Sequence, residues 1–474
     1  MTTPSLVSDI DRPTCQANPQ AAVAIIGGGF SGAMTALHLR RTLAPGRTIL
    51  LIERAGEFAR GLAYTDTGAP HLLNVRAANM SAFPDDPGHF ERWVAGQGAR
   101  AEAELHRTSS GLFASRQLYG DYLQETLSAA AARSGGTVRL VRDEVETLTR
   151  DGDAWVLGLK SGQQVTASGV VLACGNLPMN RPNEGVVYHN PWAAEVLQGL
   201  RPDAALLIVG TGLTMVDLVL ALHARGFHGP LTALSRRGLL SLAHEPIPQP
   251  WPTPEFTPQQ RATALGLLRA VRAEVAKAAT QAVGWRAVID SLRPITAPLW
   301  RGLPTVERAR FYRHARPYWD IHRHRMAPTA AATLAELQEN GQLTYQRGRI
   351  TAIAPAPEGA LVSIAPPNGL PTTRAVQRVI YATGLQGVRT GSGLLAALLA
   401  EGSARLDAQE LGLDVDERLA VLDRLGQPVP GLWALGPLVR GVFWECLAVP
   451  DIRVQARALA EAIARALVAG AIPR

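Results

Sequence analysis

Two stretches of the chain share one pattern of apolar and polar positions. In the first, an apolar run at 22–26 is followed by glycines, a helical pattern and a second apolar run at 48–52. In the second, an apolar run at 206–209 precedes glycines, an apolar helix and a run at 231–235. Short apolar runs on both sides of a helix are typical of parallel strands joined by a crossover. The pattern predicts an α/β chain with two doubly wound units.

The glycines of the first stretch fit a phosphate-binding turn. Gly27, Gly29 and Gly32 fill the positions of a G-x-G-x-x-G motif. The first permits a tight turn, the second lets the main chain approach a pyrophosphate, and the third lets helix and strand pack closely. The phosphates would then meet the positive end of the helix dipole. Glu53 ends the second apolar run, 26 positions after Gly27, where a carboxylate can accept both hydroxyls of an adenosine ribose.

The second stretch repeats this motif with the opposite charge at its end. Gly210 and Gly212 fill the first two glycine positions, and Met215 replaces the third. Arg236, followed by Arg237, stands 26 positions after Gly210, and an arginine there suits a ribose 2′-phosphate. At roughly 1.5 to 3 kcal/mol for each charge-assisted contact, two such contacts favour NADPH over NADH by about two to four orders of magnitude. The alternative is an arginine on a solvated turn beside an NAD site.

Two further apolar strands that end in glycine indicate how the units are connected. They lie at 170–175 and 379–385, on either side of the second motif. Two such crossings predict that the second dinucleotide-binding domain is inserted into the first. We expect a disordered leader at 1–20, a first domain built from 21–180 and 376–474, and an NADPH-binding domain at 181–375 with a helical insertion at about 240–340.

The helical insertion carries a dense group of basic and aromatic residues at 316–325. His314, His322 and His324 lack a carboxylate or cysteine partner at a standard spacing, so we expect no metal site. The arginines fit two interpretations that the sequence leaves open: surface or domain-bridging groups, or contacts to an anionic substrate or to the cofactor phosphates.

Composition excludes several classes of protein. The chain has 474 residues, too many for a single core, and 47% of them are hydrophobic; yet no uncharged apolar run reaches the roughly 18 to 20 residues that span a bilayer. The net charge of +7 comes mainly from scattered arginines, since lysine occurs only at Lys160 and Lys277, and this argues against nucleic-acid binding. Three scattered cysteines and a polar N-terminal segment predict a cytoplasmic protein without an export signal.

The order of the motifs resembles the two-dinucleotide-domain flavoproteins, especially class B flavin monooxygenases. The resemblance rests on the two glycine motifs, the Ala-Cys-Gly-Asn crossing at 173–176 and the Ala-Thr-Gly at 382–384. More narrowly, segments 61–64, 74–77, 319–326 and 436–451 are similar to FAD-dependent urate hydroxylase or aspartate N-monooxygenase-like proteins. One departure from the wider superfamily is Pro437, where an aspartate often follows the glycine to bind the ribityl chain.

This resemblance implies a monooxygenase with two cofactors. NADPH would pass hydride to FAD, the reduced flavin would react with oxygen, and the C4a-(hydro)peroxide would transfer one oxygen atom to a small polar amine or ring. An NADPH-dependent reductase or dehydrogenase with a non-oxygen acceptor, or a redox-sensing flavoprotein, remains an alternative. The sequence carries no readable signal for the substrate or the oligomeric state. The expected contacts are Gly27, Gly29, Phe30, Ser31, Gly32, Glu53, Arg54 and Gly436 for FAD; Gly210, Thr211, Gly212, Leu213, Thr214, Arg236 and Arg237 for NADPH; and Asn74, Arg440, Trp444 and Glu445 near the flavin ring.

Overall fold

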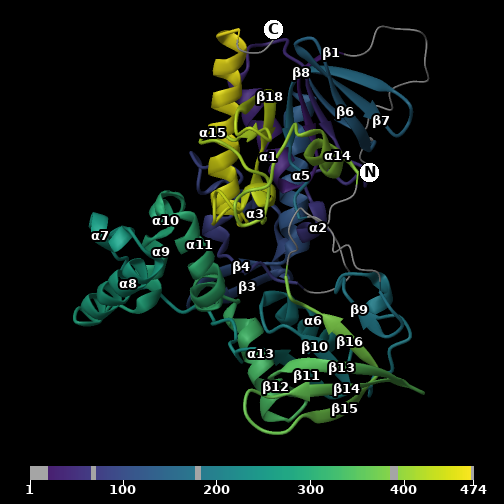
Figure 1. Cartoon of the computed structure of the whole chain (residues 1–474), viewed down its shortest axis with the longest axis vertical. Coiled ribbons are helices and arrows are strands. Elements are labelled where there is room, and N and C mark those ends of the chain that lie inside the picture. The colour runs from purple at the N-terminus through teal and green to yellow at the C-terminus, as the bar shows by residue number, and fades with distance from the viewer. Residues whose placement is uncertain (1–19, 66–70, 177–182, 385–392, 471–474) are drawn as a thin grey trace.

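Two parallel sheets, each flanked by helices, and a lobe of short helices make up the molecule (Figure 1). The structure is a computed structural model and describes residues 20–65, 71–176, 183–384 and 393–470. The predicted leader therefore lies outside the described residues, apart from Gln20. The first sheet occupies the upper half of Figure 1, the second the lower half, and the helical lobe projects to the left.

The first sheet contains the N-terminal glycine motif. Its strands follow the order β17-β18-β8-β1-β2-β5, in which the pairs from β18 to β5 are parallel and β17 is antiparallel to β18. The antiparallel pair β6 and β7 extends from β8. The elements are β1 (Gln20–Ile26), α1 (Phe30–Thr42), β2 (Ile49–Ile52), α5 (Arg116–Ala132), β5 (Val138–Val141), β6 (Val145–Asp151), β7 (Ala154–Leu159), β8 (Gln164–Leu172), α14 (Leu394–Glu401), β17 (Ala420–Leu422), β18 (Pro428–Ala434) and α15 (Val449–Val468).

The second sheet repeats this arrangement. Its parallel order, β12-β11-β10-β16-β9, corresponds strand for strand to β5-β2-β1-β8-β18 of the first sheet. A three-stranded antiparallel sheet leads into β16, as β6 and β7 lead into β8. The elements are β9 (Val187–Tyr188), β10 (Leu206–Val209), α6 (Leu213–Ala224), β11 (Leu231–Ser235), α13 (Pro328–Glu339), β12 (Leu343–Arg347), β13 (Arg349–Ala356), β14 (Gly359–Ala365), β15 (Thr372–Val376) and β16 (Arg378–Tyr381).

The helical lobe differs in detail from the sequence prediction. The sequence pattern at 259–283 predicts a single helix, but two helices form, because Thr263 accepts a hydrogen bond from the Gly266 amide and so begins a new helix. The basic segment 316–325 is largely helical, with Pro317 in the first turn of its helix and a π-helical turn at Phe311–Ala315 before it. The helices are α7 (Pro258–Arg261), α8 (Ala264–Ala279), α9 (Trp285–Ser291), α10 (Arg293–Gly302), α11 (Thr305–Arg310) and α12 (Arg316–Arg323).

Between the first motif and α5 the chain forms short elements that the sequence pattern did not predict. A hairpin and several helical turns cover the ends of the first sheet. They are α2 (Gly61–Tyr64), the 3-10 turn η1 (Ala77–Asn79), α3 (His89–Gly96), α4 (Ala99–Glu102), β3 (Leu105–Thr108) and β4 (Gly111–Ala114).

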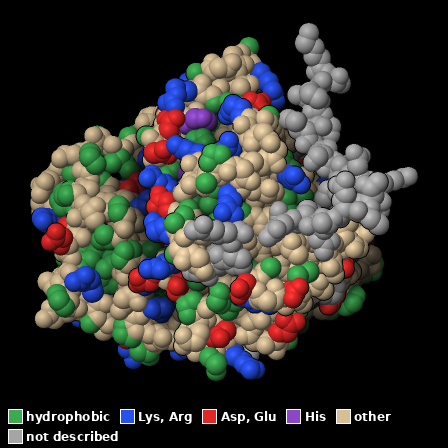
Figure 2. Space-filling model, turned by 90° about the horizontal axis from the view of Figure 1, so that it is seen from above, with side chains coloured by type: hydrophobic (Ala, Val, Ile, Leu, Met, Phe, Trp, Pro, Cys, Tyr) green, Lys and Arg blue, Asp and Glu red, His purple; other side chains and the backbone are tan. Residues whose placement is uncertain are grey.

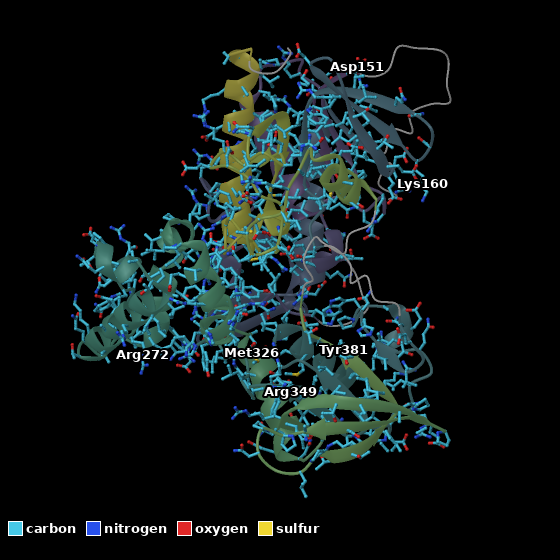
Figure 3. All side chains as sticks on the ribbon, in the orientation of Figure 1. Asp151, Lys160, Arg272, Met326, Arg349 and Tyr381 are labelled. Carbon is cyan, nitrogen blue, oxygen red and sulfur yellow. The ribbon has the colours of Figure 1, made fainter. Side chains whose placement is uncertain are left out.

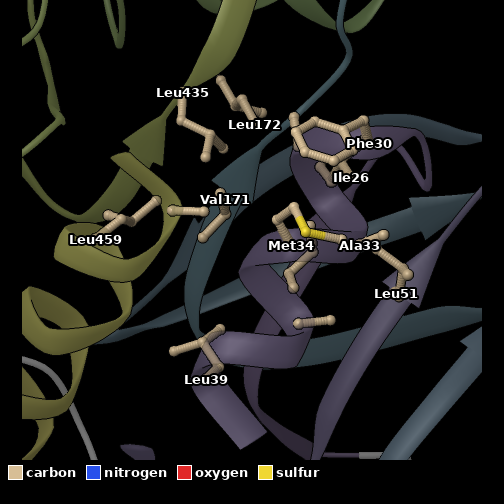
Figure 4. Close-up of a cluster of buried hydrophobic side chains, with 14 of the residues drawn as sticks. Ile26, Phe30, Ala33, Met34, Leu39, Leu51, Val171, Leu172, Leu435 and Leu459 are labelled. Carbon is tan, nitrogen blue, oxygen red and sulfur yellow. The ribbon is translucent and has the colours of Figure 1, made fainter. Parts of the chain in front are cut away.

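The largest core lies around α1, between the first sheet and α15. Residues 30–39 of α1 are all buried. Figure 4 shows Val171 of β8 between Met34 of α1 and Leu459 of α15. Because α1 is enclosed on both sides, its first turn is held firmly against the glycine loop that precedes it.

The described parts of the chain contain neither a membrane-spanning helix nor a cluster of metal-binding side chains. No helix there is both long and apolar enough to cross a membrane. No group of three or more histidine, cysteine, aspartate or glutamate side chains is gathered there to hold a metal ion.

Candidate dinucleotide and substrate sites

The first glycine turn has no room for a side chain at Gly27 or at Gly32. Gly27 has φ +103°, and a Cβ there would lie 2.5 Å from the Ala173 carbonyl oxygen. A Cβ on Gly32 would lie 1.9 Å from the Gly27 carbonyl oxygen. The first turn of α1, which begins after Gly29, contains no acidic residue and receives no side-chain cap. Its amides are therefore available to a pyrophosphate, as the motif predicts.

Glu53 is fixed beside this turn at the end of β2. Its Oε2 accepts a hydrogen bond of 2.7 Å from the Gly28 amide, and its Oε1 accepts one of 2.9 Å from the Ala55 amide. An ionised carboxylate has about four acceptor sites, so two remain for ribose hydroxyls. Arg54, also predicted here, is exposed and lies 3.5 Å from Glu144.

Gly436 lies against the first turn of α1. Its φ is +69°, and a Cβ on Gly436 would lie only 2.4 Å from Ser31 Oγ. The Gly436 amide donates to Gln455 Oε1 of α15 at 2.7 Å. Phe30 is buried, and its ring meets Tyr64 edge-on at 6.3 Å between centroids. The predicted FAD contacts other than Arg54 are thus brought to one place, which fits the predicted ligand.

The second glycine turn has the same geometry. Gly210 has φ +118°, and a Cβ there would lie 2.3 Å from the Ala382 carbonyl oxygen, as Gly27 meets Ala173. The first turn of α6, after Gly212, again has no acidic residue and no side-chain cap. Thr211 Oγ1 donates to the Leu239 carbonyl at 2.5 Å. Leu213 and Thr214, also predicted here, belong to that first turn and are half-buried.

The end of β11 presents basic side chains where the 2′-phosphate is expected. Arg236 is exposed, and no ion pair is found for it within the described ranges. Arg237 Nη2 donates to the Arg313 carbonyl at 2.9 Å, and its guanidinium lies 5.9 Å from the centre of the Tyr318 ring. Arg347 Nε donates to the Arg236 carbonyl at 3.4 Å. The charge at this end is therefore uncompensated, as a phosphate site requires.

A cavity of about 1050 Å³ lies where the two dinucleotide units and the helical lobe meet. Of the residues predicted near the flavin, Asn74 and Glu445 line it, whereas Arg440 and Trp444 are not among its lining residues. The lining also includes Tyr64, Leu73, Arg76, Arg116, Leu213, His244, Asp290, Arg293, Arg323, His324, Arg325, Glu417, Cys446, Asp451, Arg453 and Gln455.

Trp444 instead helps to dock the helical lobe on the first domain, and Arg440 is anchored within that domain. Trp444 packs on Trp300 of α10, with 4.7 Å between ring centroids, and Trp300 Nε1 donates to the Gly441 carbonyl at 2.8 Å. Arg440 is buried, and its Nε donates to the Leu411 carbonyl at 3.1 Å. Their contact with the flavin stays a prediction.

Glu445 is a buried carboxylate in the cavity wall. Burial opposes its ionisation, but the charges of His324 and Arg323 and a hydrogen bond from Trp319 outweigh burial, so its pKa lies below the usual value. Trp319 Nε1 donates to Oε1 at 2.7 Å, and Arg323 Nε lies 3.4 Å from Oε2. Glu445 is therefore ionised at neutral pH and acts as an acceptor of hydrogen bonds rather than as an acid.

The two dinucleotide domains are joined directly beside the cavity. Arg116 Nη2 lies 2.6 Å from Asp217 Oδ2 of α6. His244 Nε2 donates to the Asn74 carbonyl at 3.0 Å. Arg76 Nη2 donates to the Glu245 carbonyl, also at 3.0 Å. These contacts hold the 71–76 segment, and with it Asn74, against the second domain.

Charged side chains gather along the boundary between the helical lobe and the rest of the molecule. Seen from above, Lys and Arg side chains lie there together with Asp and Glu (Figure 2). One pair across this boundary joins Arg293 Nη1 to Asp451 Oδ2 at 2.6 Å. The sequence did not single out Arg293 or Gln455, because no motif marks them and only the folded chain places them at the cavity. Asp451 lies in the 436–451 segment that carried the resemblance, but the resemblance assigned it no role.

Comparisons with known proteins agree with this fold. Residues 24–177 match the family described as FAD-NAD(P)-binding. The ornithine N-hydroxylase of Kutzneria sp. 744, solved with reduced FAD, NADP+ and L-ornithine, has a similar structure, with a TM-score of 0.63, 14% identity, and 94% of this chain and 99% of that chain covered. The L-lysine 6-monooxygenase of Pseudomonas syringae is also similar, with a TM-score of 0.61 and 17% identity, over 94% of this chain and 100% of that chain. No curated protein sequence matches the chain.

A reductase also has a related structure. The bacillithiol disulfide reductase of Bacillus cereus matches with a TM-score of 0.51 and 15% identity, over 94% of this chain and 99% of that chain. Likenesses at such identities show the fold, and they confirm the predicted α/β class with dinucleotide-binding units. The narrower resemblance to urate hydroxylase or aspartate N-monooxygenase proteins stays a prediction.

Proposed function

We propose that this protein is a FAD- and NADPH-dependent monooxygenase of the cytoplasm that oxidises a small polar molecule. The observation that carries the proposal is the pairing of two matching dinucleotide turns with unlike charges at their ends. Glu53 follows β2 of the first sheet, and Arg236 follows β11, the corresponding strand of the second sheet. A carboxylate suits the free ribose of FAD, and an arginine suits the phosphorylated ribose of NADPH.

The domain assignment follows the same division. We propose the expected domains, 21–180 with 376–474 for FAD and 181–375 for NADPH, with the helical insertion at about 240–340. One strand departs from these bounds: β16 (Arg378–Tyr381) pairs with β10 in the second sheet and so belongs to the NADPH-binding domain. The continuous parallel order β18-β8-β1 supports this assignment, because it joins strands from both outer segments in one sheet.

The cavity is the proposed substrate site. Its volume of about 1050 Å³ suits the flavin ring together with a small substrate, since ligand pockets commonly enclose roughly 300 to 1000 Å³. FAD held by the first glycine turn and Glu53 would supply the redox chemistry, that is, hydride acceptance and oxygen activation. Asn74 and Glu445 orient polar groups of the ligands, and the docked lobe, through Trp300 and Trp444, excludes bulk water from the site.

An NADPH-dependent reductase is the second candidate function, supported by the likeness to the bacillithiol disulfide reductase. Within the described residues the free thiols are Cys174 and Cys446. Burial raises the pKa of both, that of Cys174 to about 11. Thiols held protonated at neutral pH are poor nucleophiles, which favours the monooxygenase.

A coupled assay distinguishes the two candidates. FAD-loaded protein is reduced with NADPH in the absence of oxygen, then mixed with oxygen and a panel of amines, amino acids and nitrogen heterocycles. We expect one panel member to lower the yield of hydrogen peroxide per NADPH and to give a product with one added oxygen atom. Full peroxide release with every compound, together with electron transfer to a dye or disulfide, would support the reductase. Protein that takes up no flavin would contradict both.

A further inference from the structure

We infer that Arg323 and Arg325 bind an anionic group of the substrate, and that the substrate is a carboxylate. The inference rests on the proposed function, since it concerns the same cavity, but it makes a separate claim about ligand charge. Both arginines line the cavity, at the point where α12 ends and the chain returns to the second domain.

Both guanidinium groups are buried with most of their hydrogen-bonding capacity unused. Arg323 is 6% exposed and Arg325 is 2% exposed. In the described structure, Nε and Nη2 of Arg323 and Nε and Nη1 of Arg325 have no hydrogen-bond partner. A guanidinium has five N–H donors, so a buried pair in this state is costly unless an acceptor is supplied. A carboxylate, with several acceptor sites on two oxygens, suits this need.

The acidic neighbours only partly satisfy these charges. Arg325 forms an ion pair with Asp290 through Nη2 alone. Arg323 has Glu445 at 3.4 Å, but Glu445 also accepts from Trp319 and lies 3.9 Å from His324. One carboxylate is thus shared among several donors, so a second anion would be stabilised here.

The net charge of the cavity lining also favours an anionic ligand. Six arginines line the cavity, namely Arg76, Arg116, Arg293, Arg323, Arg325 and Arg453. The acidic residues of the lining are four, namely Asp290, Glu417, Glu445 and Asp451. One residue of each sign has its ion-pair partner outside the lining, namely Glu417 with Arg301 and Arg116 with Asp217, so the excess stays at two arginines. The excess of positive charge favours an anionic ligand over a cationic one.

The arginine pair stands on a firm support. The Met326 amide donates to the Leu242 carbonyl, and the His244 amide donates to the Met326 carbonyl, each at 2.9 Å. Figure 3 places Met326 where the helical lobe joins the second domain. The guanidinium of Arg325 lies 5.9 Å from the centre of the Trp285 ring. Because the backbone is anchored on both sides, the donors are preorganised for a ligand.

The phosphates of NADPH are a second source of anionic oxygen, so the test must separate the two. Isothermal titration of the FAD-loaded protein measures binding of linear dicarboxylates from malonate to adipate, their uncharged diamides, 1,4-diaminobutane and NADP+. The variants are Arg323→Gln and Arg325→Gln, with Arg323→Lys and Arg325→Lys as conservative changes. Arg272→Gln is the control, since Arg272 is exposed on α8 and lies away from the cavity (Figure 3).

We expect at least one dicarboxylate to bind the wild type, and its diamide and the diamine to bind at least tenfold more weakly. Each Gln variant should lower the affinity for the dicarboxylate at least tenfold, and each Lys variant should lower it less. Arg272→Gln should change this affinity less than twofold. The affinity for NADP+ should change less than twofold in every variant. Because the Lys variants keep the charge, they test the inference even if a Gln variant does not fold. The inference is overturned if no dicarboxylate binds, if diamides bind equally well, or if the loss falls on NADP+ instead. Arginine-dependent carboxylate binding without oxygen use would leave the inference standing and remove the proposed function.

Discussion

At the scale of single residues, one charge distinguishes two otherwise matching nucleotide sites. Glu53 is held by the Gly28 and Ala55 amides, whereas Arg236 projects from the end of β11 into solvent. The sequence alone identified this contrast, because the spacing from the first glycine is the same in both motifs.

The cofactor preference follows from Arg236. Arg236→Ala removes a cation from the expected 2′-phosphate site, which lowers kcat/KM for NADPH by about 10- to 100-fold, since a charge-assisted hydrogen bond contributes about 1.5 to 3 kcal/mol. The value for NADH should change less than twofold. Steady-state kinetics with both nucleotides measure this, with Arg225→Ala, at the opposite end of α6, as the control. Equal loss with both nucleotides would exclude a role in phosphate recognition.

His244 makes the contact between the domains sensitive to acid. Burial is the main cause that lowers its pKa to about 4, and Arg325 and Arg76 add to the effect. Its Nε2 donates to the Asn74 carbonyl, while its buried Nδ1 has no partner in the described structure. Protonation would therefore place a charge at Nδ1 without an acceptor.

The resulting pH dependence has a defined sign. Because the folded-state pKa is below the unfolded value of 6.5, the stability contributed by neutral His244 is present above pH 6.5 and is lost as the pH falls toward 4. By pH 5 the loss is about 2 kcal/mol. Urea unfolding at pH 7.5 and 5.0 measures it. His244→Gln, which keeps a donor for Asn74 but does not titrate, should reduce the difference by that amount; an unchanged difference would assign the acid sensitivity elsewhere.

At the scale of elements, the third glycine of the first turn and the second glycine of the other turn differ in how closely they are packed. A Cβ on Gly32 would overlap the Gly27 carbonyl, whereas a Cβ on Gly212 would meet nothing within 4 Å. Gly32→Ala should thus destabilise the protein by about 3 kcal/mol, because α1 must move away from its strand. Gly212→Ala should change stability by less than about 1 kcal/mol. Denaturant unfolding of both variants checks this, and equal losses would show that α1 has room to shift.

The strands and helices of the two motifs were predicted well from the sequence. The strands at 206–209 and 231–235 have the expected bounds, because a buried parallel strand is a continuous apolar run between glycines. The helical lobe was predicted less accurately. Its helices α10 and α12 carry internal or early prolines and many arginines, so they lack a simple apolar period, and contacts with the rest of the molecule determine them.

At the scale of the whole molecule, the cavity is a product of three parts that are distant in sequence. Asn74 comes from the first domain, Leu213 from the second and Arg325 from the end of the helical lobe. Periodicity predicts elements but not how they meet, so Asn74 and Glu445 were placed here only by resemblance, and Arg440 and Trp444 were placed beside them although they line no part of the cavity.

The ion pair of Arg116 and Asp217 is expected to couple the two domains. Its side chains are 18% and 7% exposed, so Asp217→Ala leaves a buried guanidinium without its partner, at a cost of about 3 to 5 kcal/mol. The double variant Arg116→Met with Asp217→Leu should be less destabilised than Asp217→Ala, since neither charge remains. Denaturant unfolding of the single and double variants measures the coupling. Additive losses would indicate that the pair does not couple the domains.

The close contact of Trp300 with Trp444 gives the molecule an intrinsic optical signal. The two indole rings lie 4.7 Å apart between centroids, one on the helical lobe and one on the segment before α15. A displacement of the lobe that separates these rings changes their emission, so such a movement can be followed in time in the unlabelled native protein.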